Sequence, residues 1–232
     1  MILWAIVPVK PLRRGKSRLA EVLSGEERAA LNKKLLIHTL DTITNVPAIE
    51  QVLVVSRDPE ALAIARFHGA RTLLEDGAPH LNLAITRATA ISKMYNAVGV
   101  LVLPADLPQM TPEDVNVMVE ASGMSPSVVI APDHRRTGTN ALLIKPPGLL
   151  TYEFGVNSFT KHVEQTRSHG VEAKIVELPS LAHDVDLPED LVFLNGDLAE
   201  WTQTEEKPSK SNGYYSEMLS QGSSPKPLGS EG

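Results

Sequence analysis

The sequence predicts an α/β protein in which helices cover both faces of a mostly parallel sheet. Short apolar runs rich in Val, Ile and Leu recur along the chain. Segments with apolar residues at helical spacing separate these runs, and most are long enough to connect parallel strands. Continuous apolar runs are typical of strands that are buried on both faces. Together these observations favour a sheet between two helical layers.

Most of the expected helices have a recognisable start. Ser24 and Glu27 form a capping box before leucines at helical spacing, and Asp58 is followed by Pro59 at a first helical position. Thr111 precedes a proline in the same way. The predicted helices cover residues 24–44, 58–69, 81–94, 111 onward, 157–170 and 188 onward. The predicted strands are residues 2–9, 52–55, 71–74, 99–103, 128–131, 141–144 and 173–178.

Composition excludes several classes of protein. The 232 residues include 28 acidic and 22 basic side chains, a net charge of −6, and only 4% are aromatic. A nucleic-acid surface needs basic and aromatic residues spread along one face, so we expect no nucleic-acid partner. There are no cysteines, which excludes disulfides and thiolate metal sites. No apolar stretch approaches 18 residues, so we expect a soluble, cytoplasmic protein without a membrane partner.

The composition changes near the C-terminus. Residues 203–232 are rich in Ser, Gly, Pro, Lys and Glu, and they have no periodic apolar face. We therefore expect a folded domain over residues 1–198 and a flexible tail over residues 199–232. A short helix around Tyr214–Leu219 that docks on a partner is the alternative for the tail.

A basic loop follows the first predicted strand. It contains Lys10, Arg13, Arg14, Lys16 and Arg18, with no acidic residue before position 21. In open α/β sheets, ligands bind beyond the carboxyl ends of the strands, so this loop predicts a polyphosphate clamp. A solvated basic loop is the alternative. The loop is not a Walker P-loop, because the position that requires a glycine is a lysine here.

Two acidic segments follow later strands. Asp106 follows the strand at residues 99–103 after two residues, at the same sheet edge as the basic loop. Asp184 and Asp186 are two residues apart, so in an extended segment their side chains point the same way. Mg²⁺ takes one or two protein carboxylates together with water and phosphate oxygens, which favours a magnesium site here. A turn role for Asp106 and a helix cap at Asp186 are the alternatives.

A second anion pocket is predicted from two further segments. Residues 138–140 read Gly-Thr-Asn, which places the hydroxyl of Thr139 and the amide of Asn140 side by side. Gly155 and Ser158 lie at a predicted helix start, where free N–H groups attract a phosphate or carboxylate. Ordinary turn and cap residues are the alternative for each segment. Together they suit a small acidic acceptor.

Five stretches in this order resemble the 2-phospho-L-lactate or phosphoenolpyruvate guanylyltransferases of coenzyme F-420 biosynthesis: PVKPLRRGKSRL, LPADLPQM, GTNALL, FGVNSFTKH and HDVDLPEDL. The resemblance covers about residues 1–195. More distantly, the chain is similar to nucleotidyltransferases that charge sugars, isoprenoid precursors and molybdopterin. The resemblance implies a three-layer Rossmann-like, glycosyltransferase-A-type fold with a mostly parallel mixed sheet. It also implies a homodimer.

The resemblance also implies roles for individual residues. By position, the triphosphate of GTP is held by Lys10, Arg13, Lys16 and Arg18. Asp106 and Asp186 bind Mg²⁺, with Asp184 as a neighbour. The acceptor contacts are Asn140, Gly155 and Ser158. Asn140 stands where phosphoenolpyruvate-using members have threonine, so Thr139 is the other candidate and the acceptor is phosphoenolpyruvate, 2-phospho-L-lactate or 3-phosphoglycerate.

The guanine site is predicted near residues 75–82. Glu75 and Asp76 are candidates to accept hydrogen bonds from guanine, and Asn82 belongs to a His-Leu-Asn segment where the family often has Gly-Leu-Asn. The predicted activity is transfer of GMP from GTP to a small phosphorylated acid, with Lys16, Arg13 and Asp106 as catalytic residues. An enzyme of this fold with another acceptor (a sugar phosphate or the molybdenum cofactor), a glycosyltransferase, and a non-catalytic nucleotide-binding domain are the alternatives.

Overall fold

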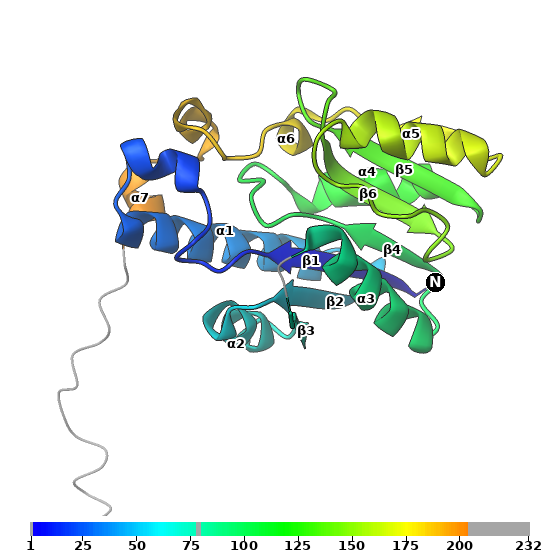
Figure 1. Cartoon of the computed structure of the whole chain (residues 1–232), viewed down its shortest axis with the longest axis horizontal. Coiled ribbons are helices and arrows are strands. Elements are labelled where there is room, and N and C mark those ends of the chain that lie inside the picture. The colour runs from blue at the N-terminus through cyan, green and yellow to red at the C-terminus, as the bar shows by residue number, and fades with distance from the viewer. Residues whose placement is uncertain (1, 78–79, 204–232) are drawn as a thin grey trace, which may run out of the picture.

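The fold is a mixed sheet between two layers of helices, as the sequence predicts (Figure 1). The computed structural model describes residues 2–77 and 80–203. Within them the sheet has seven strands in the order β3-β2-β1-β4-β6-β5-β7. Their bounds are β1 Leu3–Val9, β2 Ile49–Ser56, β3 Arg71–Leu74, β4 Gly99–Val102, β5 Ser127–Pro132, β6 Thr139–Lys145 and β7 Ala173–Ile175.

One strand runs against the others. The pairs β1–β2, β1–β4, β2–β3 and β5–β7 are parallel, whereas β6 is antiparallel to both β4 and β5. In register, Val102 of β4 lies opposite Leu142 of β6. Because β6 is reversed, its first residues, Thr139 and Asn140, lie at the sheet edge where the parallel strands end.

Helices cover both faces because the side chains of β1 alternate between two cores. The α-helices within the described residues are α1 Gly25–Thr44, α2 Pro59–Phe67, α3 Leu81–Met94, α4 Pro112–Ser122, α5 Ser158–Ser168, α6 Pro179–Ala182 and α7 Leu198–Thr202. Leu3, Ala5 and Val7 pack with α1, α2 and α4, while Trp4 and Ile6 pack with α3 and α5 (Figure 1). None of these helices combines the length and apolar character needed to cross a membrane.

The predicted start signals are present. Ser24 and Glu27 form the capping box of α1, Asp58 caps α2, and Thr111 caps α4. The late strand is shorter than predicted, because it ends at Ile175, and the segment that begins at Pro188 is a 3-10 helix, η2 (Pro188–Phe193). A second 3-10 helix, η1 (Ser17–Glu21), follows the basic loop.

A third, smaller core joins the two ends of the described chain. Leu19 and Leu35, from η1 and α1, pack with Val185 and Leu194, and Trp201 of α7 covers them. The predicted flexible tail from residue 199 is therefore wrong for residues 199–202, which belong to α7. The rest of that prediction, from residue 204 on, lies outside the described residues. This core brings the acidic segment at residues 184–186 back to the basic loop.

Candidate active site

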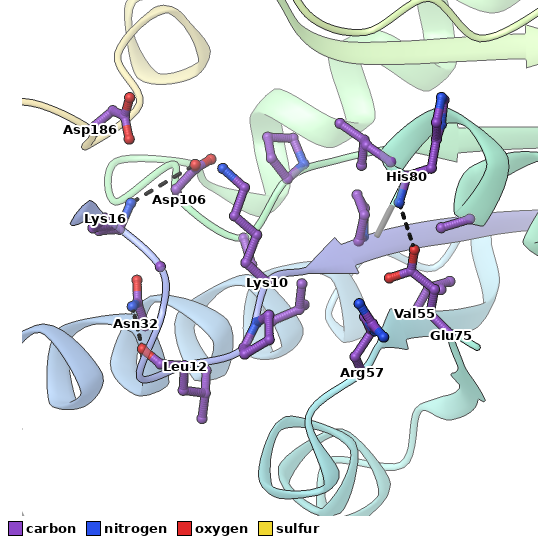
Figure 2. A pocket seen from close by; sticks show the side chains of 18 residues that line it. Lys10, Leu12, Lys16, Asn32, Val55, Arg57, Glu75, His80, Asp106 and Asp186 are labelled. Atoms are coloured by element: carbon purple, nitrogen blue, oxygen red, sulfur yellow. Dashed lines mark hydrogen bonds and ion pairs between the residues drawn. The ribbon is translucent and has the colours of Figure 1, made fainter. Parts of the chain in front are cut away.

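A cavity of about 390 Å³ opens beyond the carboxyl ends of β1 and β2 (Figure 2). Lys10 and Lys16 of the basic loop line it, together with Arg57 at the end of β2. Glu75 and Asp106 line it from the segments that follow β3 and β4. Asp186 lines it as well, so the cavity combines three cations with three carboxylates, which suits a ligand that has both a polyphosphate and hydrogen-bond donors.

The basic loop is held in one shape by contacts at its turn. The N–H of Leu12 donates to Asp58 Oδ2 at 2.8 Å, and Asn32 Nδ2 donates to the carbonyl of Leu12 at 2.7 Å. The N–H of Gly15 donates to the carbonyl of Pro11 at 2.9 Å. A Cβ atom at Gly15 would lie 2.8 Å from Asn32 Nδ2, so a larger residue here would displace this amide from its hydrogen bond to Leu12. The loop is thus preorganised around its lysines.

Lys16 has an unusual backbone and a buried side chain. Its φ and ψ of 55° and 45° lie in the left-handed region, which costs about 1–2 kcal/mol for a residue other than glycine. The side chain is almost fully buried; its ammonium donates to the carbonyl of Val185 and lies 3.9 Å from Asp106 Oδ2 (Figure 2). Strained residues of this kind cluster at functional sites, where the surrounding structure holds them in place.

Three aspartates gather beside this lysine. The N–H of Val185 donates to the carbonyl of Asp106 at 3.0 Å, which holds the 184–186 segment next to the end of β4. Asp186 pairs with Arg18 at 2.8 Å. Burial, and then the negative charge of Asp106, raise the pKa of Asp184 to about 6. The sequence prediction that these carboxylates converge with the basic loop is confirmed.

Whether these residues suit a metal ion depends on their donor atoms. Among residues 2–77 and 80–203, no three His, Cys, Asp or Glu side chains form a metal-binding cluster by themselves. However, Oδ1 of Asp106 is buried and has no hydrogen-bond partner within that part of the chain. A buried carboxylate oxygen without a partner is costly unless a ligand satisfies it. One or two carboxylates with an open oxygen fit Mg²⁺, which takes its other ligands from water and phosphate.

A second cavity, also of about 390 Å³, adjoins the first. Thr139 and Asn140 line it from the start of β6, and Gly155 and Ser158 line it near the start of α5. The two cavities share a short list of lining residues: Pro8, Leu81, Pro104, Asp106 and Asp186. The basic cavity and the polar one therefore meet at the acidic pair.

Charge differs sharply between the two cavities. The second is lined by Asp106, Asp133, Asp184 and Asp186, and by no lysine or arginine of the described chain. Burial raises the pKa of Asp133, but hydrogen bonds from the N–H of Gly138 and from the N–H and hydroxyl of Thr137 outweigh it, so the pKa is lowered overall. A bound cation would offset this negative field for an anionic molecule that enters the cavity.

The start of α5 offers less to an anion than predicted. The N–H of Ser158 donates to the carbonyl of Gly155 at 3.1 Å, and the N–H of Phe159 donates to the carbonyl of Thr137 at 3.2 Å. The prediction of free N–H groups is wrong for these two. Ser158 still contributes its buried hydroxyl to the cavity wall.

Other predicted site residues lie apart from the cavities or are already engaged. Arg13, Arg18 and Asp76 are exposed and line neither cavity, so the contact of Arg13 and Arg18 with the triphosphate stays a prediction. The side chain of Asn82 exchanges two hydrogen bonds with the backbone of Phe154, at 2.9 and 3.2 Å. Asn82 thus fixes the wall of the second cavity rather than facing a base.

Sequence reasoning missed one cation of the first cavity. Arg57 follows β2 directly, as Asp106 follows the end of β4, and it lies near Glu75 in Figure 2. Its position at the carboxyl end of a buried strand was the available signal. The sequence does not indicate the role of His80 at this cavity. The N–H of His80 donates to Glu75 Oε1 at 3.0 Å and holds that carboxylate at the cavity.

The fold is shared with solved nucleotidyltransferases. A nucleotidyl transferase from Methanothermobacter thermautotroptrophicus superposes with a TM-score of 0.62 at 16% identity, over 83% of this chain and 94% of that one. The 4-diphosphocytidyl-2C-methyl-D-erythritol synthase from Anaerococcus prevotii gives 0.58 at 14% identity, over 83% and 93%. The three-layer fold with a mostly parallel mixed sheet that the resemblance implies is confirmed, and it is the fold of these solved nucleotidyltransferases.

Sequence relatives narrow this class. The family model described as "Guanylyl transferase CofC like" matches residues 3–203. A phosphoenolpyruvate guanylyltransferase from Rubrobacter xylanophilus is 42% identical over 194 residues, 84% of this chain and 94% of the relative. Another, from a Roseiflexus species, is 39% identical over 84% of this chain and 85% of the relative. The chain belongs to the CofC-like guanylyl transferase family.

Proposed function

We propose that this protein transfers GMP from GTP to phosphoenolpyruvate, with release of pyrophosphate, in the biosynthesis of coenzyme F-420. The observation that carries the proposal is the meeting of two cavities at Asp106 and Asp186. One cavity has the cations that a triphosphate needs, and the other has the size and polar groups for a small acid. Relatives at 42% and 39% identity are named for this activity. A cytoplasmic location belongs to the proposal, because both substrates are cytoplasmic metabolites.

In this proposal the first cavity holds GTP. Lys10, Lys16 and Arg57 contact the phosphates, with arginine able to grip two oxygens and lysine acting as a point charge. The carboxylate of Glu75 accepts hydrogen bonds from N1–H and the 2-amino group of guanine, donors that adenine does not present together. Asp76 and Asn82 have no role in this reading, since one is exposed and the other bonds Phe154.

The carboxylates at the junction would hold Mg²⁺, with Asp106 and Asp186 as ligands and Asp184 as a neighbour. Bound there, the ion would offset the charge of the phosphates and orient them. This role fits the unpartnered oxygen of Asp106 and the absence of lysine and arginine from the described wall of the second cavity.

The reaction needs positioning more than acid–base chemistry. A phosphate oxygen of the acceptor forms a bond to the α-phosphorus of GTP, the bond from that phosphorus to the bridging oxygen of pyrophosphate breaks, and pyrophosphate leaves with the electron pair. The acceptor phosphate is already anionic near neutral pH, so no base is required. Lys16, which lines the first cavity beside Asp106, stabilises the negative charge that develops on the leaving group.

The acceptor was left open by the sequence, because Asn140 replaces a threonine. Nδ2 of Asn140 donates to the carbonyl of Leu181 at 2.9 Å, so its amide is partly committed to tying β6 to α6. The hydroxyls of Thr139 and Ser158 remain to meet the carboxylate of the acid. Phosphoenolpyruvate is preferred over 2-phospho-L-lactate and 3-phosphoglycerate because the relatives are named for it.

The test is product analysis with purified protein. GTP, Mg²⁺ and each of the three acids are incubated with the protein, pyrophosphate release is measured, and the guanylylated product is identified by mass spectrometry. Coupling to the next pathway enzyme protects a labile diphosphate. We expect product from phosphoenolpyruvate and GTP, with ATP and CTP as controls. GTP binding without pyrophosphate for any acid would instead indicate a non-catalytic nucleotide-binding protein.

A further inference from the structure

His162 is a buried histidine that the reaction above does not use. It lies on α5, within the FGVNSFTKH stretch, and has 0% exposure. Its ring makes two hydrogen bonds: Nδ1 lies 3.0 Å from Oγ1 of Thr139, and Nε2 lies 3.2 Å from the backbone nitrogen of Glu153. The ring of Phe154 contacts it edge-on at 5.1 Å between centroids. The histidine thus links α5, the loop at residues 153–154 and the start of β6.

The contact with Glu153 fixes which ring nitrogen carries the proton. A backbone N–H can only donate, so Nε2 of His162 must accept and must be unprotonated. The neutral ring then carries its proton on Nδ1, which donates to Oγ1 of Thr139. Burial lowers the pKa of His162 to about 4, so the ring stays neutral near physiological pH. The assignment therefore holds under working conditions.

The direction of this hydrogen bond determines what Thr139 can offer a ligand. Oγ1 of Thr139 accepts from His162, so its own proton is available for donation. Within the described residues the hydroxyl has no other hydrogen-bond partner, and Thr139 lines the second cavity. Four aspartates line the same cavity. A directed donor is therefore scarce where an acidic ligand must bind.

We propose that His162 is a positioning residue that makes the hydroxyl of Thr139 a hydrogen-bond donor to the carboxylate of the phosphorylated acid. This inference rests on the proposed function. The carboxylate is the expected partner because the acceptor phosphate must approach the α-phosphorus of GTP near Asp106 and Asp186, which both cavities share. Thr139 lines the second cavity and not the first. It lies where the other end of the acid would reach.

The experiment compares Thr139→Val, His162→Gln, the double variant and His162→Asn by steady-state kinetics. Glutamine can place an amide near the Nε2 position and keep the contact with Glu153, whereas asparagine can place a donor near Nδ1 and keep the contact with Thr139. Thr139→Val should raise KM for phosphoenolpyruvate about 10- to 100-fold, as expected for losing a hydrogen bond to a charged group, with KM for GTP within about twofold. His162→Gln should raise the same KM.

The double variant is the decisive comparison. If His162 acts through Thr139, KM for phosphoenolpyruvate in the double variant should be about the same as in Thr139→Val alone. The increase in this KM should be at least about threefold smaller in His162→Asn than in His162→Gln. The proposal would be overturned if the increases in KM for phosphoenolpyruvate of the two single variants multiply in the double variant. It would also be overturned if this KM is unchanged in Thr139→Val, or if it rises equally in the two histidine variants. Thermal unfolding of each variant checks that it folds.

A measurement without substrate separates this inference from the proposed function. Nitrogen-15 NMR of the wild-type protein reports which ring nitrogen of His162 is protonated, with His162→Gln used to assign the signal. A proton on Nδ1 supports the inference, and a proton on Nε2 overturns it. If the wild type makes no guanylylated product with any acid, the proposed function fails, whatever the tautomer.

Discussion

Replacing Lys16 with alanine should remove most of the activity. The ammonium lies 3.9 Å from Asp106 Oδ2, close to where the phosphates are proposed to bind. At this distance, with an effective dielectric constant of about 20, two unit charges interact by about 4 kcal/mol. Water that enters the vacated space recovers part of this energy. We therefore expect turnover to fall by about 10²- to 10³-fold, the range for losing one preorganised charge-stabilising group.

The assay is pyrophosphate release at saturating GTP and phosphoenolpyruvate, with thermal unfolding measured in parallel. Arg14→Ala is the matched control, because Arg14 belongs to the same loop but is exposed and lines neither cavity. It should stay within about twofold of the wild type. Alanine at position 16 must adopt the same left-handed backbone, so the strain is unchanged. A folded Lys16→Ala protein with wild-type turnover would refute the assigned role.

Three further outcomes are expected. Chelation of divalent cations should abolish phosphoenolpyruvate binding in calorimetry, because four aspartates and no described lysine or arginine line the second cavity. Added Mg²⁺ should restore this binding. Equal binding with and without the chelator would contradict the prediction. The pKa of His162 is about 4 in the folded state and 6.5 in the unfolded state, so the unfolded state gains the proton first as pH falls. The free energy of unfolding should therefore drop by on the order of 2 kcal/mol between pH 7 and 5. Chemical denaturation should show a smaller drop in His162→Gln. Asn82→Ala removes both hydrogen bonds to Phe154 and should lower the same free energy by about 1–3 kcal/mol; a denaturation curve that matches the wild type would show that these bonds add nothing.

Much of the fold could be predicted because buried parallel strands are continuous apolar runs and the helices carry capping residues. The reversal of β6 could not, since an apolar run such as residues 141–144 reads the same in either direction. Strand direction depends on the connections and on neighbours, here β4 and β5. Helix α7 was also missed, because its stability comes from packing of Trp201 on the third core rather than from its own sequence.

The site could be predicted where residues follow strands directly. Asp106 and the basic loop converge because parallel strands end at one edge. Arg13 and Lys16 could not be distinguished by spacing alone, because the left-handed turn at Lys16 sends its side chain inward, while Arg13 stays exposed. A single arginine such as Arg57 is indistinguishable in sequence from a solvated one. The hydrogen bond between His162 and Thr139 joins two elements, so no local pattern contains it.

Because β6 is reversed, its first residues lie at the sheet edge where the cavities open, and the two cavities are built largely from different segments of the chain. The walls of the second cavity that the first does not share come largely from residues 133–158, while the basic cavity is built mainly from residues 8–106. Evolution can therefore alter the choice of acid within one contiguous stretch and leave nucleotide recognition intact. A chimera that exchanges residues 133–158 with those of a relative that uses a different acid should inherit the donor's acid preference and keep its own nucleotide.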